Sequence, residues 1–285
     1  MIRIENLNYI YQQGMPSEKY ALKDINAEIP TGDFCALIGH TGSGKSTLVQ
    51  HLNGLIKPTS GKIYIDDTEI TAPKSNLKKI RQKVGLVFQY PENQLFEETV
   101  FADIAFGPKN MGLGEGEIKK RVYDAAELVG LEKSLLEKSP FDLSGGQKRR
   151  TAIAGVLSMQ PEILILDEPT AGLDPTGRDA LLNILTSLHK NSSMTVILVS
   201  HSMEDVAKVA EHIIVMNKGS IAMQGTVSEV FKRGRELCDM GLNIPQITIL
   251  TQKLIQMGIN LPDDIYTVKY AARKILEMTG GKENV

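Results

Sequence analysis

The chain has 285 residues, of which 42% are hydrophobic and 23% charged, a balance typical of a globular protein and not of a disordered one. Its 32 Lys and Arg nearly offset 34 Asp and Glu, and a net charge of -2 is unlike the basic surface of a routine nucleic-acid-binding domain. No apolar run reaches the roughly 18 residues that cross a bilayer, no signal-peptide pattern begins the sequence, and two cysteines are too few for a disulfide framework. We therefore expect a protein on the cytosolic side that reaches a membrane, if at all, through a partner.

Four short, β-branched apolar runs predict strands buried on both faces, as in a parallel sheet covered by helices. They span residues 34–38, 84–88, 163–166 and 195–199. Two alternating segments predict β-hairpins: residues 61–71, turning at Asp66-Asp67, and residues 212–224, turning at Lys218-Gly219. The expected fold class is α/β, with a mainly parallel core sheet and an antiparallel β subdomain.

Between residues 91 and 158 the pattern becomes helical. Four apolar residues share one face of a charged helix: Ile118, Val122, Ala126 and Val129. Three glycines are expected to break the chain before that helix: Gly112, Gly114 and Gly116. We interpret this stretch as a helical subdomain inserted between two core strands. Helical patterns return after Thr226, punctuated by Pro245 and Pro262, and residues 280–285 are expected to fray.

A glycine-rich loop lies between the predicted strand 34–38 and a predicted helix at 47–55. It fits the phosphate-loop pattern G-x-x-x-x-G-K-S with Gly39, His40, Thr41, Gly42, Ser43, Gly44, Lys45 and Ser46. Its glycines let backbone N–H groups surround phosphate oxygens, and the helix start adds its positive end. We expect Lys45 to bridge the β- and γ-phosphates and Ser46 to bind Mg²⁺, with Thr47 completing the nucleotide-binding set. A chance Gly-rich turn is the alternative.

The apolar strand 163–166 is followed by two carboxylates, Asp167 and Glu168. In a parallel sheet the carboxyl ends of the strands line the ligand crevice, so Asp167 is placed to hold Mg²⁺. Glu168, where the chain turns, could orient or deprotonate the water that attacks the γ-phosphate. The alternative is a pair of solvated carboxylates at a strand end.

A second anion-binding pattern stands in Leu143-Ser144-Gly145-Gly146-Gln147. A serine at a helix start and two glycines expose backbone N–H groups, as in the phosphate loop. Because one nucleotide already has its loop, this second helix start suggests that two chains face each other. Each ATP would then lie between one phosphate loop and the other chain's LSGGQ. The alternative is an ordinary capped helix.

Together these motifs make residues 1–231 resemble the ATP-binding subunits of ABC transporters. The resemblance implies that Gln89, closing KVGLVFQ, is the Q-loop glutamine that contacts Mg²⁺ and the attacking water. It likewise implies that His201, ending TVILVSH, is the switch histidine that contacts the γ-phosphate, although such a histidine taken alone is more often a plain strand end. Asp174, in Ala171-Gly172-Leu173-Asp174, matches the D-loop, which meets the other subunit.

The aromatic side chain that stacks on adenine is less sharply defined. Tyr11 aligns best with the family's A-loop aromatic, and stacking needs only a π-face within reach. Tyr9 and Tyr20 are competitors that could equally be packing residues.

Residues 90–113 and DEPTAGLDPTGR are similar to the energy-coupling factor (ECF) group of ABC importers, and most similar to the second of its two ATPase subunits. That resemblance implies a peripheral protein on the cytoplasmic side of the cell membrane, forming a heterodimer with a homologous ATPase. It also implies a transmembrane coupling subunit and a membrane-embedded component that binds a vitamin, cobalt, nickel or a similar micronutrient. Coupling helices are expected to dock near residues 92–99, where Leu95 and Phe96 are either exposed or local core. Residues 232–285 form a predicted helical extension that we interpret as stabilising the dimer.

Other ABC-type ATPases maintain DNA or act in translation without a membrane partner. The DNA-maintenance proteins usually carry a long coiled coil between the phosphate loop and LSGGQ, and this chain has no heptads there. The near-neutral charge argues against routine nucleic-acid binding, so we expect no nucleic-acid partner. Many translational relatives carry two cassettes, whereas this chain has one set of motifs. A binding-only module is disfavoured by the complete Glu168/His201 pair.

Overall fold

The four apolar runs form neighbouring strands of one six-stranded sheet, as the sequence predicts. The structure is a computed structural model that describes residues 1–279. The strand order is β10-β9-β3-β8-β7-β6, with parallel pairing throughout except for β10 at the edge. The strands are β3 (Phe34–Gly39), β6 (Val84–Val87), β7 (Ile163–Asp167), β8 (Thr195–Val199), β9 (His212–Asn217) and β10 (Ser220–Thr226).

The central strands are apolar without interruption because both faces of the sheet are covered. In β7, Leu164 and Leu166 pack into one hydrophobic cluster, and Ile163 and Ile165 pack into a second one on the opposite face. Alternation along a strand sends successive side chains to opposite faces, so each strand contributes to two cores. This double burial fixes where β7 ends, and with it where the two carboxylates after Leu166 lie.

A second sheet is antiparallel, in the order β2-β1-β4-β5. Its strands are β1 (Ile2–Tyr11), β2 (Lys19–Ile29), β4 (Ser60–Ile65) and β5 (Thr68–Glu69). The predicted hairpin at 61–71 is confirmed by β4 and β5. The pairing of β1 with β2 shifts register at three places, which breaks up the alternation that would have marked them as strands in the sequence. The hairpin predicted at 212–224 is also present, but it extends the core sheet.

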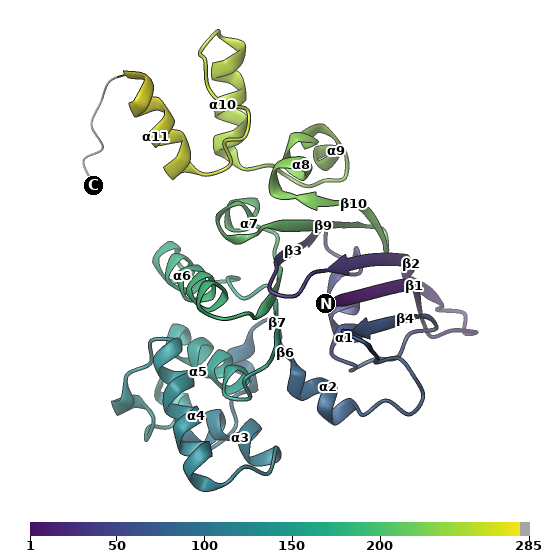
Figure 1. Ribbon diagram of the computed structural model, residues 1–285, viewed down its shortest axis with the longest axis vertical. Coiled ribbons are helices and arrows are strands. Elements are labelled where there is room, and N and C mark those ends of the chain that lie inside the picture. Colours follow the sequence, from purple (N-terminus) through teal and green to yellow (C-terminus); the bar gives the residue numbers. More distant parts are fainter. Residues whose placement is uncertain (280–285) are drawn as a thin grey trace.

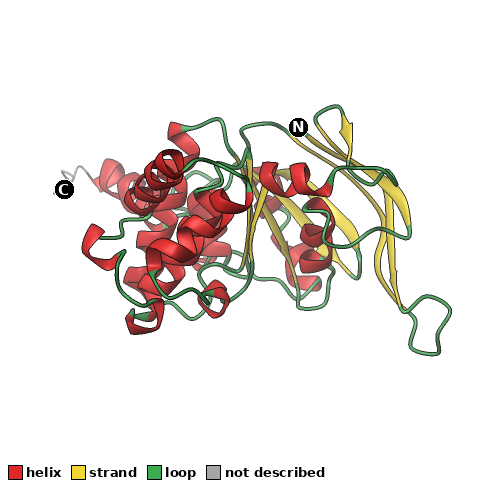
Figure 2. Ribbon diagram, turned by 90° about the horizontal axis from the view of Figure 1, so that it is seen from below, coloured by secondary structure: helices red, strands yellow, loops and turns green. Residues whose placement is uncertain are grey.

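Helix α1 (Lys45–Leu52) lies between the two sheets (Figure 1). Leu48, Val49 and Leu52 are nearly fully buried in the cluster that joins Ile4 of β1 to Ile165 of β7. The helix predicted at 47–55 begins two residues earlier than expected, directly after Gly44, and ends three residues earlier, at Leu52. Figure 2 shows most helices on one side of the molecule and the antiparallel strands on the other.

The predicted helical subdomain is present between β6 and β7. It contains α3 (Val100–Asn110), α4 (Glu115–Leu128) and α5 (Gly145–Leu157), with short 3-10 turns at Pro91–Gln94, Lys133–Leu135 and Pro140–Asp142. The four apolar residues predicted on one face, 118, 122, 126 and 129, are all buried. Gly116 was expected before this helix but lies in the first turn of α4. Helix α2 (Leu77–Lys83) precedes β6, and α6 (Pro175–Asn191) covers the same sheet face as the subdomain.

The C-terminal part lies at the end of the molecule opposite the helical subdomain (Figure 1). Its helices are α8 (Val227–Lys232), α9 (Gly234–Asp239), α10 (Gln246–Gln256) and α11 (Val268–Thr279), whereas α7 (Met203–Val209) connects β8 to β9 of the core sheet. The predicted domain boundary at 231/232 falls within α8. Leu237 and Leu242, which lie beyond that boundary, pack in one hydrophobic cluster with Phe231 of the core. The boundary therefore stays a prediction. The expected fraying of residues 280–285 lies outside the described residues.

Phe231 joins the extension to the core, because it is fully buried and its ring lies 5.4 Å from that of Tyr266. We expect Phe231→Ala to lower the free energy of unfolding by about 3–5 kcal/mol, since a large cavity is left behind. The control Phe141→Ala, whose side chain is 65% exposed, should change it by no more than about 0.5 kcal/mol. Urea unfolding of both variants measures the difference, and equal midpoints would contradict this account of the junction.

Candidate functional site

The predicted motifs meet at one edge of the core sheet. The phosphate loop follows β3, Gln89 follows β6, Asp167 and Glu168 lie at the end of β7, and His201 follows β8. Because these strands run parallel, their carboxyl ends bring these motifs to the same edge.

The phosphate loop requires glycine for steric reasons at its two ends. A Cβ on Gly39 would lie 2.4 Å from the carbonyl oxygen of Met216. Gly44 has φ +105, and a Cβ there would lie 2.7 Å from the carbonyl oxygen of Ala21. No side chain fits at either position, so strands β2 and β9 hold the loop close against the sheet.

The Lys45 ammonium is enclosed by the loop. Its Nζ donates hydrogen bonds to the carbonyl oxygens of Gly39 (2.7 Å) and His40 (3.1 Å). Burial lowers the pKa of Lys45, while the negative charges of Glu168 and Asp167 act in the opposite direction. The loop thus combines the buried Lys45 ammonium with the exposed residues Thr41, Gly42 and Ser46. Together they supply hydrogen-bond donors that fit an anionic phosphate chain.

The other loop residues are held by contacts of their own. The His40 ring lies 2.8 Å from the carbonyl oxygen of Thr41 and 3.2 Å from Oδ1 of Asn217. Ser43 is fully buried, and its backbone oxygen accepts from the N–H of Gly219. The loop is therefore fastened to the turn between β9 and β10.

Asp167 and Ser46 supply oxygen atoms of the kind that Mg²⁺ prefers. Burial raises the pKa of Asp167, although a hydrogen bond from Ser46 opposes this shift. Nowhere in residues 1–279 do three His, Cys, Asp or Glu side chains form a group that could hold a metal ion. A magnesium ion at Ser46 and Asp167 would therefore need further oxygen ligands from a nucleotide or water.

Glu168 is held from both sides. Nε2 of Gln89 donates to its Oε2 at 3.0 Å, and Nε2 of His201 lies 2.7 Å from its Oε1. Glu168 itself has φ +51, a conformation that non-glycine residues rarely adopt. Its carboxylate lines a cleft of about 270 Å³ together with Ser200 and His201. The structure thus brings the side chains of Gln89, Glu168 and His201 together, while their catalytic roles stay predictions.

Tyr11 lies beside the phosphate loop. Its hydroxyl is 3.2 Å from Oγ1 of Thr47, and the residue is 40% exposed. Tyr9 packs edge-on against both Tyr11 and His51, as a packing residue does. Tyr20 is exposed, with the Lys23 ammonium 5.7 Å from the centre of its ring. This geometry favours Tyr11 as the stacking residue.

In the LSGGQ segment, Ser144, Gly145 and Gly146 are exposed, whereas Leu143 is buried. Ser144 and Gln147 cap α5 reciprocally, and a Cβ on Gly145 or Gly146 would meet open space. Asp174 caps α6 by accepting from the N–H of Gly177 at 3.2 Å. In the described part of the chain, no hydrogen bond or ion pair joins residues 144–147 to the phosphate loop. One chain alone therefore does not bring its two anion-binding helix starts together.

Sequence reasoning missed a buried polar group behind the site. Arg149 is paired with Glu92 and also bonds the backbone after Glu168, and Thr170 bonds Asp205. The sequence offered one signal of this group. Arg149 and Arg150 directly follow LSGGQ-Lys in a predicted helix, and a helix that packs on a core buries only one of its sides. Nothing in the spacing identified their partners.

A model of the family described as ABC transporter matches residues 22–171, more than half of the chain. The chain therefore belongs to the ABC transporter family, whose ATPase cassettes bind and hydrolyse ATP.

Within that family the chain is similar along its length to curated ECF proteins. It is 57% identical to "Energy-coupling factor transporter ATP-binding protein EcfA2" of Caldanaerobacter subterraneus, covering 100% of this chain and 99% of the relative. The relative of the same name in Clostridium perfringens is also 57% identical, over 97% of this chain and 98% of its own length. These relatives confirm the resemblance to the ECF group and to its second ATPase.

Solved structures agree with this assignment. The structure of cbiO1 from Clostridium perfringens, described as part of the ABC transporter complex cbiONQ, has a TM-score of 0.75 and 42% identity, covering 88% of this chain and 98% of cbiO1. The dimeric bacterial ABC transporter cassette MJ0796 has a TM-score of 0.72 and 32% identity, covering 80% of this chain and 99% of the cassette. The predicted fold class is thereby confirmed.

Glu168→Gln should slow hydrolysis strongly and trap a closed, ATP-bound dimer. Glutamine keeps the size of the side chain and one acceptor oxygen but cannot take a proton from water, so we expect turnover to fall by about 10² to 10⁴. Light scattering with ATP measures the dimer, and phosphate release measures turnover.

The matched control is Glu162→Gln, because its side chain is 66% exposed and pairs with Lys83 away from the phosphate loop. This variant should hydrolyse ATP like the wild type. Wild-type turnover in Glu168→Gln would refute the catalytic role of Glu168.

Proposed function

We propose that this chain powers an ECF importer by hydrolysing Mg²⁺-ATP at a site it shares with a homologous second ATPase. The observation that carries the proposal is the group formed by Glu168, Gln89 and His201 beside a complete phosphate loop. The full-length similarity to ECF ATP-binding proteins supports the transport role.

The need for a second subunit is supported by what one chain lacks. Each phosphate loop needs an LSGGQ segment, and the segment at Ser144 is solvent-facing and free of contacts with its own loop. A homologous partner would supply the missing helix start and receive this one in return, with Asp174 at the junction. The exposed apolar residues of α10, Ile249 and Leu250, support a dimer-stabilising role for the extension.

The hydrolytic mechanism is positional and electrostatic. Mg²⁺, held by Ser46, Asp167 and Gln89, would supply positive charge against the phosphate oxygens. Lys45 would leave the carbonyl oxygens of Gly39 and His40 for the β- and γ-phosphates. Glu168 orients and deprotonates the attacking water, and His201 contacts the γ-phosphate. Tyr11 stacks on adenine.

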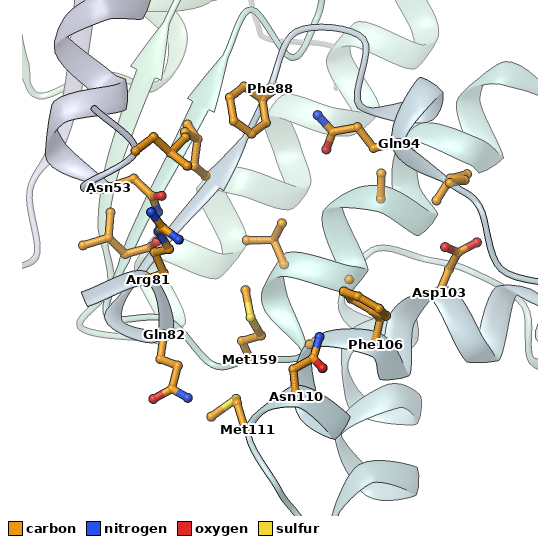
Figure 3. Close-up of a pocket in the computed structure, with 18 of the residues that line it drawn as sticks. Asn53, Arg81, Gln82, Phe88, Gln94, Asp103, Phe106, Asn110, Met111 and Met159 are labelled. Atoms are coloured by element: carbon orange, nitrogen blue, oxygen red, sulfur yellow. The ribbon is translucent and has the colours of Figure 1, made fainter. Parts of the chain in front are cut away.

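A groove between the helical subdomain and the segment from α2 to β6 fits the docking of a membrane subunit. Its volume is about 660 Å³, and it is mainly apolar, lined by Phe88, Leu95, Phe96, Phe106, Met111 and Met159 among others. Figure 3 shows Arg81 and Gln82 on one side and Asp103 and Phe106 on the other. Phe96 is 60% exposed, in keeping with the docking segment expected at 92–99.

Asp103 gives this groove a polar feature. Its Oδ1 accepts the N–H groups of Phe96 and Glu97, whereas its buried Oδ2 has no partner. Burial, together with the negative charge of Glu97, raises the pKa of Asp103, although the N–H groups of Phe96 and Glu97 oppose this shift.

Within residues 1–279 no helix has the length and apolar character to cross a bilayer. The similarity to ECF ATP-binding proteins supports attachment to the cytoplasmic face of the cell membrane through the coupling subunit. A separate membrane-embedded component would bind the cargo, a vitamin or a metal such as cobalt or nickel.

Co-purification from native membranes in mild detergent tests the whole proposal. With this chain tagged, we expect to recover a second P-loop ATPase, a transmembrane coupling subunit and one or more small substrate-binding membrane proteins. Recovery of self-dimers alone, or of nucleic acid, would leave the ATPase chemistry intact and remove the transport role.

The groove makes a sharper prediction about the same complex. Phe106→Glu should abolish recovery of the coupling subunit, because it places a charge in the apolar wall, while the isolated chain still binds ATP. The control Leu128→Glu, at an exposed position of α4 outside the groove, should leave recovery unchanged. Equal recovery with both variants would exclude the groove as the docking surface.

A further inference from the structure

The Arg149 guanidinium is buried at a junction of three segments. Arg149 belongs to α5, the helix that LSGGQ begins, and its side chain is only 5% exposed. It contacts Glu92 on one side and the backbone that follows Glu168 on the other. No other arginine among residues 1–279 is buried to this degree.

Toward the docking segment, Arg149 forms a two-pronged ion pair. Its Nη2 donates to Oε1 of Glu92 at 2.7 Å, and its Nε donates to Oε2 at 3.1 Å. Burial of Glu92 acts to raise its pKa, but the hydrogen bonds from Arg149, a backbone N–H and the charge of Arg149 together hold the pKa below its usual value. The pair is therefore ionised and geometrically fixed at neutral pH.

Toward the catalytic carboxylate, Arg149 holds two carbonyl groups. Its Nη1 donates to the oxygen of Pro169 at 2.9 Å and to that of Ala171 at 2.7 Å. Between them, the Thr170 hydroxyl donates to buried Oδ2 of Asp205 at 3.0 Å. Three consecutive residues after Glu168 are thus fixed from two directions.

The bonds to residues 169–171 restrain the backbone next to Glu168. Its left-handed backbone is intrinsically unfavourable and persists only where the surroundings determine it. The bonds to residues 169–171 act directly beside that strained residue, and its carboxylate must reach both Gln89 and His201. A small shift of these carbonyls would move the carboxylate away from its contacts.

We propose that Arg149 is a positioning residue that ties the placement of Glu92, and with it the docking segment, to the placement of Glu168. When a docked membrane subunit displaces residues 92–99, the Arg149 guanidinium moves with Glu92. The backbone that Arg149 holds beside Glu168 is then displaced as well, and with it the catalytic carboxylate. The inference rests on the proposed function, because it assigns the transmission path of that same site. Docking and catalysis are linked without any contact between the membrane subunit and ATP.

The test uses the complete complex reconstituted in liposomes, with Arg149→Lys and Glu92→Gln. Lysine keeps the positive charge, but its single ammonium cannot bond Glu92 twice and both carbonyls at once. We expect kcat for ATP hydrolysis to fall by about tenfold to a hundredfold in Arg149→Lys, with KM for ATP unchanged, because only the placement of Glu168 is lost. Glu92→Gln, which leaves Arg149 in place with a neutral partner, should reduce kcat less.

Two further measurements separate positioning from a general loss of structure. Amide hydrogen exchange in a peptide covering residues 168–174 should speed up in Arg149→Lys, while exchange in β8 stays as in the wild type. The control Glu137→Gln, an exposed carboxylate of the same subdomain, should match the wild type in kcat and exchange. Faster exchange throughout the chain would assign Arg149 to stability alone and overturn the proposal.

Wild-type kcat in both variants, or a raised KM at constant kcat, would also overturn it. If Arg149→Lys does not assemble, Glu92→Gln decides by the same readouts. Failure of the proposed function looks different, since the wild-type chain would then recover no coupling subunit.

Discussion

The carboxylate of Glu168 is the point on which the site depends. Nε2 of Gln89, after β6, donates a hydrogen bond to it, Nε2 of His201, after β8, lies 2.7 Å from it, and Glu168 itself directly follows β7. Three adjacent parallel strands thus meet at one carboxylate, and this is geometrically feasible only because each strand stops at the same edge of the sheet. Burial of β7 on both faces keeps that edge fixed, so the packing of the core sets the geometry of the chemistry.

The nucleotide side of the site depends on the contact between the two sheets. Helix α1 is enclosed by both, and the phosphate loop at its start is fastened to Ala21 and Met216 by approaches that only glycine permits. Lys45 meanwhile rests on loop carbonyl oxygens, which keeps a buried cation satisfied. The same chain leaves Ser144 in solvent. The phosphate loop is therefore complete within one chain, whereas the helix start at Ser144 is exposed. In the proposed dimer, a second subunit brings such a helix start to each phosphate loop.

Much of this fold follows from local patterns in the sequence. The apolar runs of the core strands, both hairpins and the buried face of α4 were predictable because period and turn residues act over a few positions. Strands β1 and β2 were not, since shifts of register interrupt their alternation. The hairpin at Lys218-Gly219 was recognised, but its membership of the core sheet depends on pairing between His212 and Cys35, far apart in the sequence.

The sequence by itself determined which groups are present and in what order: the phosphate loop, Gln89, LSGGQ, Asp167, Glu168 and His201. These are contiguous motifs, and the family to which they belong was recognisable from them. Only the tertiary structure decided that Glu92 pairs with Arg149, 57 residues away, that Arg149 holds the backbone beside Glu168, and that Asp103 keeps an unpartnered oxygen in an apolar groove. The physical reason is that long-range pairs are set by the packing of whole elements, and spacing along the chain carries no record of that packing.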